Sequence, residues 1–175
     1  MVKIPTSWKG LQANFELLDW IIYDGQLTTT NASTALVLFD NTEAGVGLDQ
    51  SNMAIANSLP SKQEFLLKAF SVHFNDVLAS ADAENILDRA SFEFLVNNSR
   101  KFVCPLREVM SEKTVIPAGV TQDEQYFMGK TYELENYIHI KGGDFFEVRI
   151  ETGETAPGAS TELTACLHGE LLRPQ

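Results

Sequence analysis

The sequence has little of the basic charge that nucleic-acid and membrane binding require. Its 175 residues include 13 Lys and Arg against 24 Asp and Glu, a net charge of −11. Phosphate backbones and anionic surfaces are bound by clustered basic side chains, so we expect no direct contact with nucleic acid. No uninterrupted apolar stretch approaches the ~20 residues of a membrane helix, and no secretory signal is evident, so we also expect no membrane partner.

Cysteine is almost absent as well. Cys104 and Cys166 are the only two. Without a secretory context, cysteines are usually reduced and behave as small core hydrophobes, which is the state we expect here. A disulfide between the two stays open as an alternative.

Residue patterns typical of catalysis are also scarce. The three histidines, His73, His139 and His168, lie far apart and inside predicted strands. The His-X-His motif of metal-binding cupins does not occur, although three strand histidines can still converge on a zinc ion. Cys166 and His168 are two residues apart, but a Cys–His nucleophile also needs an orienting group and a pocket. Gly45-Val46-Gly47 lacks the third glycine and the helix of a phosphate-binding loop.

We therefore expect no enzyme, no cofactor and no metal site. A hydrolase that uses two of the many carboxylates ranks last among the alternatives, because no pair stands out.

What the sequence does have is apolar and aromatic strand patterns. Hydrophobic residues make up 44% of the chain, which includes 11 Phe, enough for the core of one domain. Seven or eight short apolar runs are separated by turn residues. One short helix is predicted over "SADAENILDRA" (80–90). Strand after strand without intervening helices predicts an all-β, antiparallel sandwich or barrel.

Alternation within the strands predicts which side chains face the core. The residues expected to be largely buried are Phe70, Val72, Phe74, Phe92, Phe94, Val148, Ile150, Leu167 and Leu171. Glu147, Arg149 and Glu151 are expected to face outward.

Three local irregularities are also predicted. The alternation in "KQEFLLKAFSVHFND" changes parity near Ala69, which predicts either a β-bulge or an edge where the covering layer changes. The run "SFEFLVNNSRKFVCPL" (91–106) predicts a hairpin with its turn at Asn97 to Arg100. Gly169 interrupts the last strand, where we expect a backbone or a large side chain to approach closely.

Two further segments are candidates for partner contact. Residues 1–30 form an N-terminal arm or a first strand, and 31–175 form the sandwich. The segment from Trp8 to Tyr23 is too apolar for a free, solvated arm, and apolar patches of this kind usually mark interfaces. The loop from Asn41 to Ser61 has no periodicity, so we expect that it is ordered by a neighbour. The expected contact residues are Trp8, Phe15, Trp20, Ile21, Tyr23, Asn52 and Met53.

Three stretches carry a resemblance to a known family. They are "SNMAIANSLPSKQEFLLKAFSVHF", "FEFLVNNSRKFVCPLREV" and "LTACLHGELLRPQ". Together they resemble single jelly-roll structural proteins of bacteriophage capsids over roughly residues 51–175. The resemblance implies a jelly-roll β-sandwich and a cement, decoration or minor capsid role, and it implies no catalytic residue.

From the resemblance we expect a virion protein that binds capsid subunits and self-associates, with a trimer favoured. The acidic charge favours the outer side of the shell, away from DNA. The alternative is a carbohydrate-binding β-sandwich module of a host-recognition device. For that role, the aromatic residues expected to form a sugar-stacking platform are Tyr126, Phe127, Tyr132 and Tyr137.

Overall fold

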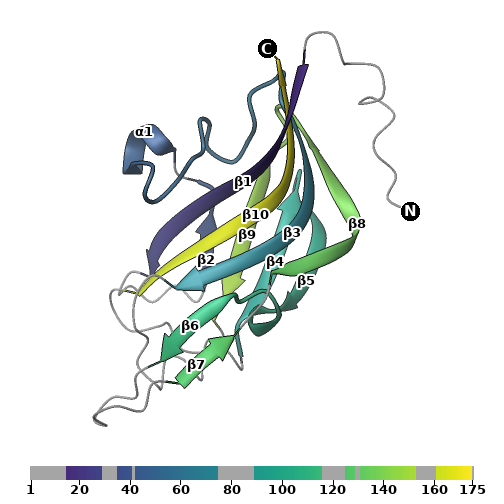
Figure 1. Cartoon of the computed structure of the whole chain (residues 1–175). Coiled ribbons are helices and arrows are strands. Elements are labelled where there is room, and N and C mark those ends of the chain that lie inside the picture. The colour runs from purple at the N-terminus through teal and green to yellow at the C-terminus, as the bar shows by residue number, and fades with distance from the viewer. Residues whose placement is uncertain are drawn as a thin grey trace.

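The structure is a computed structural model, and it describes residues 15–28, 35–40, 42–74, 89–115, 125–128, 131–152 and 161–174. Almost all regular structure within these ranges is β-strand (Figure 1). The strands are β1 (Phe15–Thr28), β2 (Ala35–Leu38), β3 (Glu64–Phe74), β4 (Ser91–Val96), β5 (Ser99–Pro105), β6 (Glu112–Val115), β7 (Gln125–Met128), β8 (Tyr132–Lys141), β9 (Phe146–Glu151) and β10 (Thr161–Pro174).

Two four-stranded antiparallel sheets pack as a sandwich. The first sheet has the order β1-β10-β3-β8 and the second has the order β2-β9-β4-β5, while β6 and β7 form a separate hairpin. The pairs β1/β10, β2/β9, β3/β8 and β4/β5 alternate between the two sheets. The chain is therefore a long antiparallel ribbon, doubled back at the β4–β5 hairpin and wound around itself, which is the jelly-roll arrangement. The predicted fold class is confirmed.

The core lies between the sheets and is built around phenylalanine. The Phe70 ring lies 5.1 Å from the rings of Phe92 and Phe102 and 5.3 Å from that of Phe94, measured between centroids. These contacts join a strand of the first sheet to two strands of the second. Eight of the nine residues predicted to be buried are buried, and the side chain of the ninth, Phe74, lies outside the described residues.

The predicted bulge occurs in β3. The register of β3 shifts between Leu67 and Ala69 against β8, and opposite His168 and Gly169 of β10. The extra residue, Lys68, lets Leu67 and Phe70 both face the core. Gly169 sits where the strands come closest, because a Cβ atom there would lie 2.2 Å from the carbonyl oxygen of Leu66. The expected close approach is confirmed.

The predicted hairpin also forms, with a tighter turn than expected. Only Asn97 and Asn98 form the loop, both with positive φ (52° and 59°), and Ser99 already belongs to β5. Asparagine tolerates this left-handed backbone better than other non-glycine residues. The Asn97 amide also binds the connection between β8 and β9, through Asp144 Oδ1 (2.9 Å) and Phe145 N (3.0 Å).

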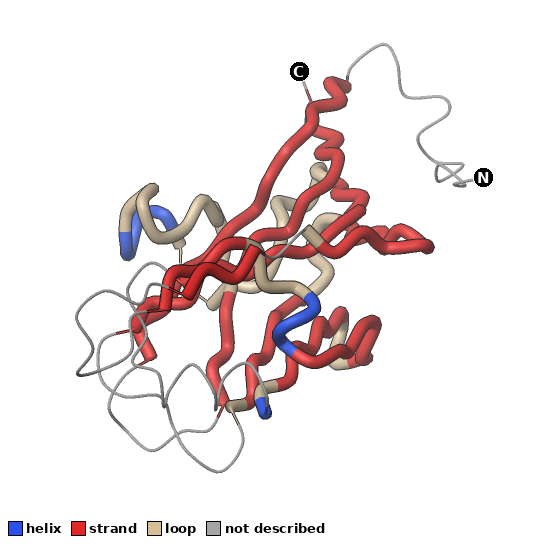
Figure 2. Tube along the Cα trace, turned by 60° about the horizontal axis from the view of Figure 1, so that its bottom comes forward, coloured by secondary structure: helices blue, strands red, loops and turns tan. Residues whose placement is uncertain are grey.

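The helical content differs from the expectation. The helix predicted over 80–90 lies almost entirely outside the described residues. A four-residue helix, α1 (Glu43–Val46), instead occurs in the loop expected to be irregular, and a 3-10 turn spans Leu106–Glu108. Both lie in connections between strands (Figure 2). No helix in the described part of the chain is long and apolar enough to span a membrane.

One outward-facing residue is not solvated as expected. Glu147 alternates with core residues Phe146 and Val148, yet only 6% of it is exposed. The guanidinium of Arg149 lies 2.5 Å from its carboxylate. A buried carboxylate is costly without a positive partner, and Arg149 supplies that charge to Glu147 on the outer face of β9.

Candidate functional site at the edge of β1

Strand β1 is the outer strand of the first sheet, and the predicted contact residues alternate along it. Ile22 packs in the core, so Trp20 shares the inner side of the sheet while Phe15, Ile21 and Tyr23 lie on its outer side. Trp8 lies outside the described residues. The segment Phe15–Tyr23 is thus part of a paired strand, in register with Pro174–Cys166 of β10.

The predicted contact loop is bound to this strand rather than separate from it. Asn52 Oδ1 accepts a hydrogen bond from the backbone N–H of Tyr23 (2.9 Å), and Asn52 Nδ2 donates to the carbonyl of Ile21 (2.7 Å). Gly25 N donates to the carbonyl of Gln50 (2.7 Å). The loop is therefore attached to the edge of β1 through one antiparallel bridge, between Asp24 and Ser51, and Figure 1 shows α1 and the loop beside β1.

A buried carboxylate fixes the far end of the same strand. Asp24 is fully buried, and its Oδ2 accepts a hydrogen bond from the backbone N–H of Phe39 (2.6 Å). Phe39 has a positive φ of 77°, an unfavourable backbone for a bulky residue. The contact links β1 of the first sheet to the chain just after β2 of the second, so the strand is held at both its edge and its end.

Most of the exposed large hydrophobic side chains of the described residues gather on these two segments. Leu17 (53% exposed), Trp20 (38%) and Ile21 (46%) lie on β1, and Leu48 and Ile55 lie on the loop. Only Val103 and Phe145 lie elsewhere. Apolar side chains that gather on an exposed surface favour association with a partner, because the contact removes them from water.

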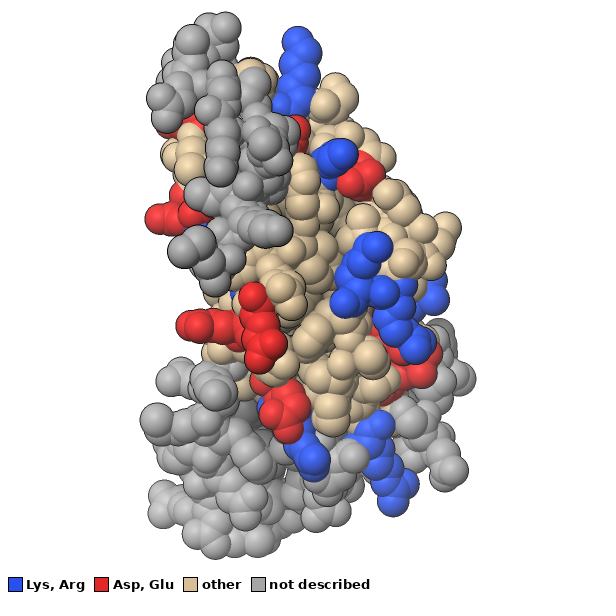
Figure 3. Space-filling model, turned by 90° about the vertical axis from the view of Figure 1, so that its right-hand side faces the viewer, with Lys and Arg blue, Asp and Glu red and all other residues tan. Residues whose placement is uncertain are grey.

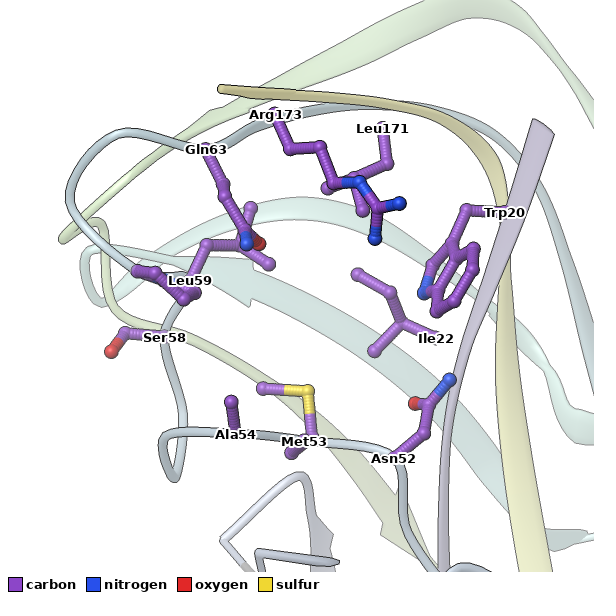
Figure 4. Close-up of a pocket in the computed structure, with 11 residues that line it drawn as sticks. Trp20, Ile22, Asn52, Met53, Ala54, Ser58, Leu59, Gln63, Leu171 and Arg173 are labelled. Carbon is purple, nitrogen blue, oxygen red and sulfur yellow. The ribbon is translucent and has the colours of Figure 1, made fainter. Parts of the chain in front are cut away.

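A pocket opens on the inner side of the same edge. It has a volume of about 170 Å³, and Trp20 and Arg173 line it together with Asn52 and Met53 (Figure 4). Three of the predicted contact residues, Trp20, Asn52 and Met53, therefore meet at one site. Phe15, Ile21 and Tyr23 do not line it.

The histidines do not converge between the sheets. His73 and His168 face outward from β3 and β10 and share the hydroxyl of Ser71, at 3.2 Å and 2.7 Å from their Nε2 atoms. His73 Nδ1 also lies 2.6 Å from Ser111 Oγ. His139 instead pairs with Glu64, with 2.7 Å between Nε2 and Oε2. Within the described ranges, no cluster of His, Cys, Asp or Glu is arranged to hold a metal ion.

Burial shifts the pKa values of His168 and Cys166 in this outer cluster, and also that of Cys104 on the other sheet. Burial, and then the charge of His73, lowers the pKa of His168 below its usual 6.5. Burial raises the pKa of Cys166 to about 11 although Ser71 donates to it. Burial, and then Glu108, raises the pKa of Cys104 to about 12. Both thiols are protonated at neutral pH, which makes them poor nucleophiles. Both cysteines are free, and they lie on opposite sheets.

Both signs of charge are present on the side of the molecule where β8 lies in Figure 1. Figure 3 shows Lys and Arg gathered on one part of this face and Asp and Glu on another. Lys68 of β3 pairs with Glu170 of β10, and the Lys68 ammonium lies 5.7 Å from the ring centre of Tyr137. The described part of this face therefore carries both signs.

Comparison of the chain with protein-family models, with curated proteins and with solved structures finds no match. The fold and the surface chemistry are therefore the available guides to function.

Sequence reasoning missed the pocket and the histidine pair. Trp20 and Arg173 come from opposite ends of the chain, and Ser71 and His168 are 97 residues apart. Only the pairing of β10 with both β1 and β3 brings them together. The expected aromatic platform is also dispersed. Tyr132 packs against the core and Tyr137 against a small outer cluster, while the side chains of Tyr126 and Phe127 lie outside the described residues.

Proposed function

We propose that this chain is a non-enzymatic structural protein of a bacteriophage virion, which binds capsid subunits and stabilises the particle. It acts as a cement, decoration or minor capsid protein, and it self-associates, with a trimer favoured. The observation that carries the proposal is the exposed apolar surface of β1 and its attached loop, presented on a jelly-roll sandwich.

The architecture supports the proposal. Eight-stranded jelly rolls recur in viral capsid proteins and in lectins. The winding seen here brings β1 to the outer edge of its sheet, where a neighbouring subunit can reach it. The loop already hydrogen-bonds the β1 edge at Ile21, Tyr23 and Gly25, so the contact is assigned to exposed side chains such as Leu17.

The apolar surface supports a contact role in particular. Leu17 and Ile21 lie on the same outer side of β1, four residues apart, and each exposes about half of its surface. A solvated protein gains nothing from this exposure, whereas an interface core is built from such residues. We place the contact with capsid subunits and with other copies of the chain here.

The charge supports the outer side of the shell. A net charge of −11 repels packaged DNA and favours a position that faces solvent. Few basic side chains are available to neutralise phosphate.

Electron cryo-microscopy of virions from the phage that encodes this chain tests the proposal. We expect shell-attached density that fits the ten-stranded fold, with β1 and the loop 48–55 at its contacts. Particles that contain no such density, in a preparation where mass spectrometry detects no copy of the chain, contradict it.

A further inference from the structure

The pocket beside Trp20 combines an apolar floor with polar side chains, as ligand-binding pockets do. Its floor is apolar, formed by Ile22, Met53, Leu59 and Leu171. Its volume of about 170 Å³ is smaller than the ~300–1,000 Å³ of pockets for drug-sized ligands. It has room for roughly five or six water molecules at ~30 Å³ each, which is about the size of one six-membered ring.

Polar groups converge over this floor. Figure 4 shows the guanidinium of Arg173 and the amide of Gln63 directed into the pocket, with the Trp20 indole forming one wall. Arg173 is anchored from outside, because its Nε donates to Glu16 Oε2 (3.0 Å). Its terminal nitrogens, the indole N–H and the Gln63 amide remain directed toward the cavity, and Ser58 also lines it.

Asn52 also lines the pocket, but its side-chain amide is not free to bind a ligand. Both atoms of its amide already bind the backbone of β1. It therefore fixes the distance between the loop that carries Ser58 and Gln63 and the strand that carries Trp20. The walls are held in place before a ligand arrives, which lowers the entropy that binding would cost.

The electrostatics favour a neutral ligand. Glu16 offsets the charge of Arg173, which is the only charged residue among the described residues that line the pocket. The molecule as a whole carries −11, so an anionic ligand is repelled as it approaches. The remaining donors and acceptors suit hydroxyl groups, since a hydroxyl both donates and accepts.

We propose that this pocket binds one neutral pyranose unit of a glycan. The Trp20 ring stacks against the apolar face of the sugar, and Arg173, Gln63 and Ser58 bind its hydroxyls. A pyranose has an apolar face and a polar rim, which matches an aromatic wall beside amide and guanidinium groups. The site lies on the inner side of β1, whereas Leu17 and Ile21 lie on the outer side. The pocket shares the loop residues Asn52 and Met53 with the proposed shell contact, but the sugar proposal does not rest on the virion role.

Nuclear magnetic resonance of the full ¹⁵N-labelled chain tests the proposal. The chain has only two tryptophans, Trp8 and Trp20, so two indole N–H signals are expected. Glucose, galactose, mannose and N-acetylglucosamine are titrated separately, with glucuronate as the anionic analogue. We expect at least one neutral sugar to shift the Trp20 signal with a dissociation constant on the order of 1 mM, as for a small ligand with few contacts.

Matched variants assign the effect to the pocket. Trp8→Phe keeps the shifting signal, and Trp20→Phe removes it. Gln63→Ala weakens binding about fivefold, the size expected for one lost hydrogen bond. Gln50→Ala, the same change on the same loop but outside the pocket, leaves the affinity unchanged.

Three results overturn the proposal. The first is no indole shift with any neutral sugar at concentrations on the order of 100 mM, far above the expected dissociation constant. The second is tighter binding of glucuronate than of every neutral sugar. The third is equal affinity in Gln63→Ala and the unaltered chain. None of them bears on the shell-binding role, which is tested on virions.

Discussion

Asn52 and Tyr23 are joined by two hydrogen bonds that make the loop part of the sheet. The side-chain Oδ1 of Asn52 accepts from Tyr23 N at 2.9 Å, and Asn52 N donates to the Tyr23 carbonyl at 3.3 Å. Since Asn52 Nδ2 also binds the Ile21 carbonyl, one residue satisfies three backbone groups on the edge of β1. The same residue forms a wall of the pocket and holds the proposed contact surface together.

Replacement of Asn52 by Ala should therefore loosen the edge of β1. We expect a loss of about 1–2 kcal/mol in the free energy of unfolding, because the groups concerned are only partly buried. Urea denaturation followed by circular dichroism measures it. Asn136→Ala, an exposed change on β8, serves as the control and should stay within ~0.5 kcal/mol of the unaltered chain. Equal stability of the two variants would show that the loop is not held by this side chain.

Gly169 should not tolerate a side chain. A Cβ atom would meet the Leu66 carbonyl oxygen at 2.2 Å and the Phe65 ring at 2.9 Å, so two strands must separate. We expect Gly169→Ala to cost about 1–3 kcal/mol or more, as overpacking does. Gly45→Ala is the control, since the nearest atom lies at 3.6 Å, and it should be neutral or slightly stabilising. Thermal melting of both variants decides the point.

The alternation of apolar residues was sufficient to predict most of this fold. It identified the core residues of β3, β4, β9 and β10, and the change of parity near Ala69 predicted the bulge. These features are local, because a strand repeats every two residues whatever its partner. The short helix at Glu43–Val46 was missed, since four residues carry too little periodic signal.

The candidate site could be predicted only in part. An excess of apolar residues singled out β1, and a lack of periodicity singled out the loop. The two are bound together by the Asn52 side chain, which contacts backbone 29 residues away, and by backbone hydrogen bonds such as Gly25 N to the Gln50 carbonyl. Arg173 reaches the pocket because β10 pairs with β1 along its whole length, which places Arg173 opposite Glu16. Pairings between distant strands leave no local pattern in a single sequence, so neither relationship was visible before the fold.

Acidification should destabilise the protein through His168. Its pKa is lowered in the folded state by burial and by His73, so the unfolded chain binds a proton more readily. Stability is unaffected well above the usual histidine pKa of 6.5 and falls as the pH drops through and below that value. Urea midpoints measured between pH 8 and pH 5 should decrease. His168→Asn should reduce this decrease, and an unchanged pH profile in that variant contradicts the account.

The two cysteines should react slowly while the protein is folded. With pKa values of about 12 for Cys104 and about 11 for Cys166, little thiolate exists at pH 8. We expect labelling by a disulfide reagent to be roughly a hundredfold slower or more in the native protein than in urea. Cys104→Ser and Cys166→Ser assign each rate. Fast labelling of either native thiol would contradict the raised pKa of that thiol and the burial that causes it.

The contact surface on β1 is the central claim, and it is tested most directly by shell binding. Emptied shells stripped of this chain are mixed with purified protein, and the bound fraction is measured by co-sedimentation. Leu17→Asp/Ile21→Asp places two charges on the outer side of β1, while Val103→Asp changes an equally exposed residue (51%) on β5 of the other sheet. We expect the double variant to bind at least about tenfold more weakly, because interface cores exclude unpaired charge. Val103→Asp should bind as the unaltered chain does. Full binding by a folded double variant would contradict the account.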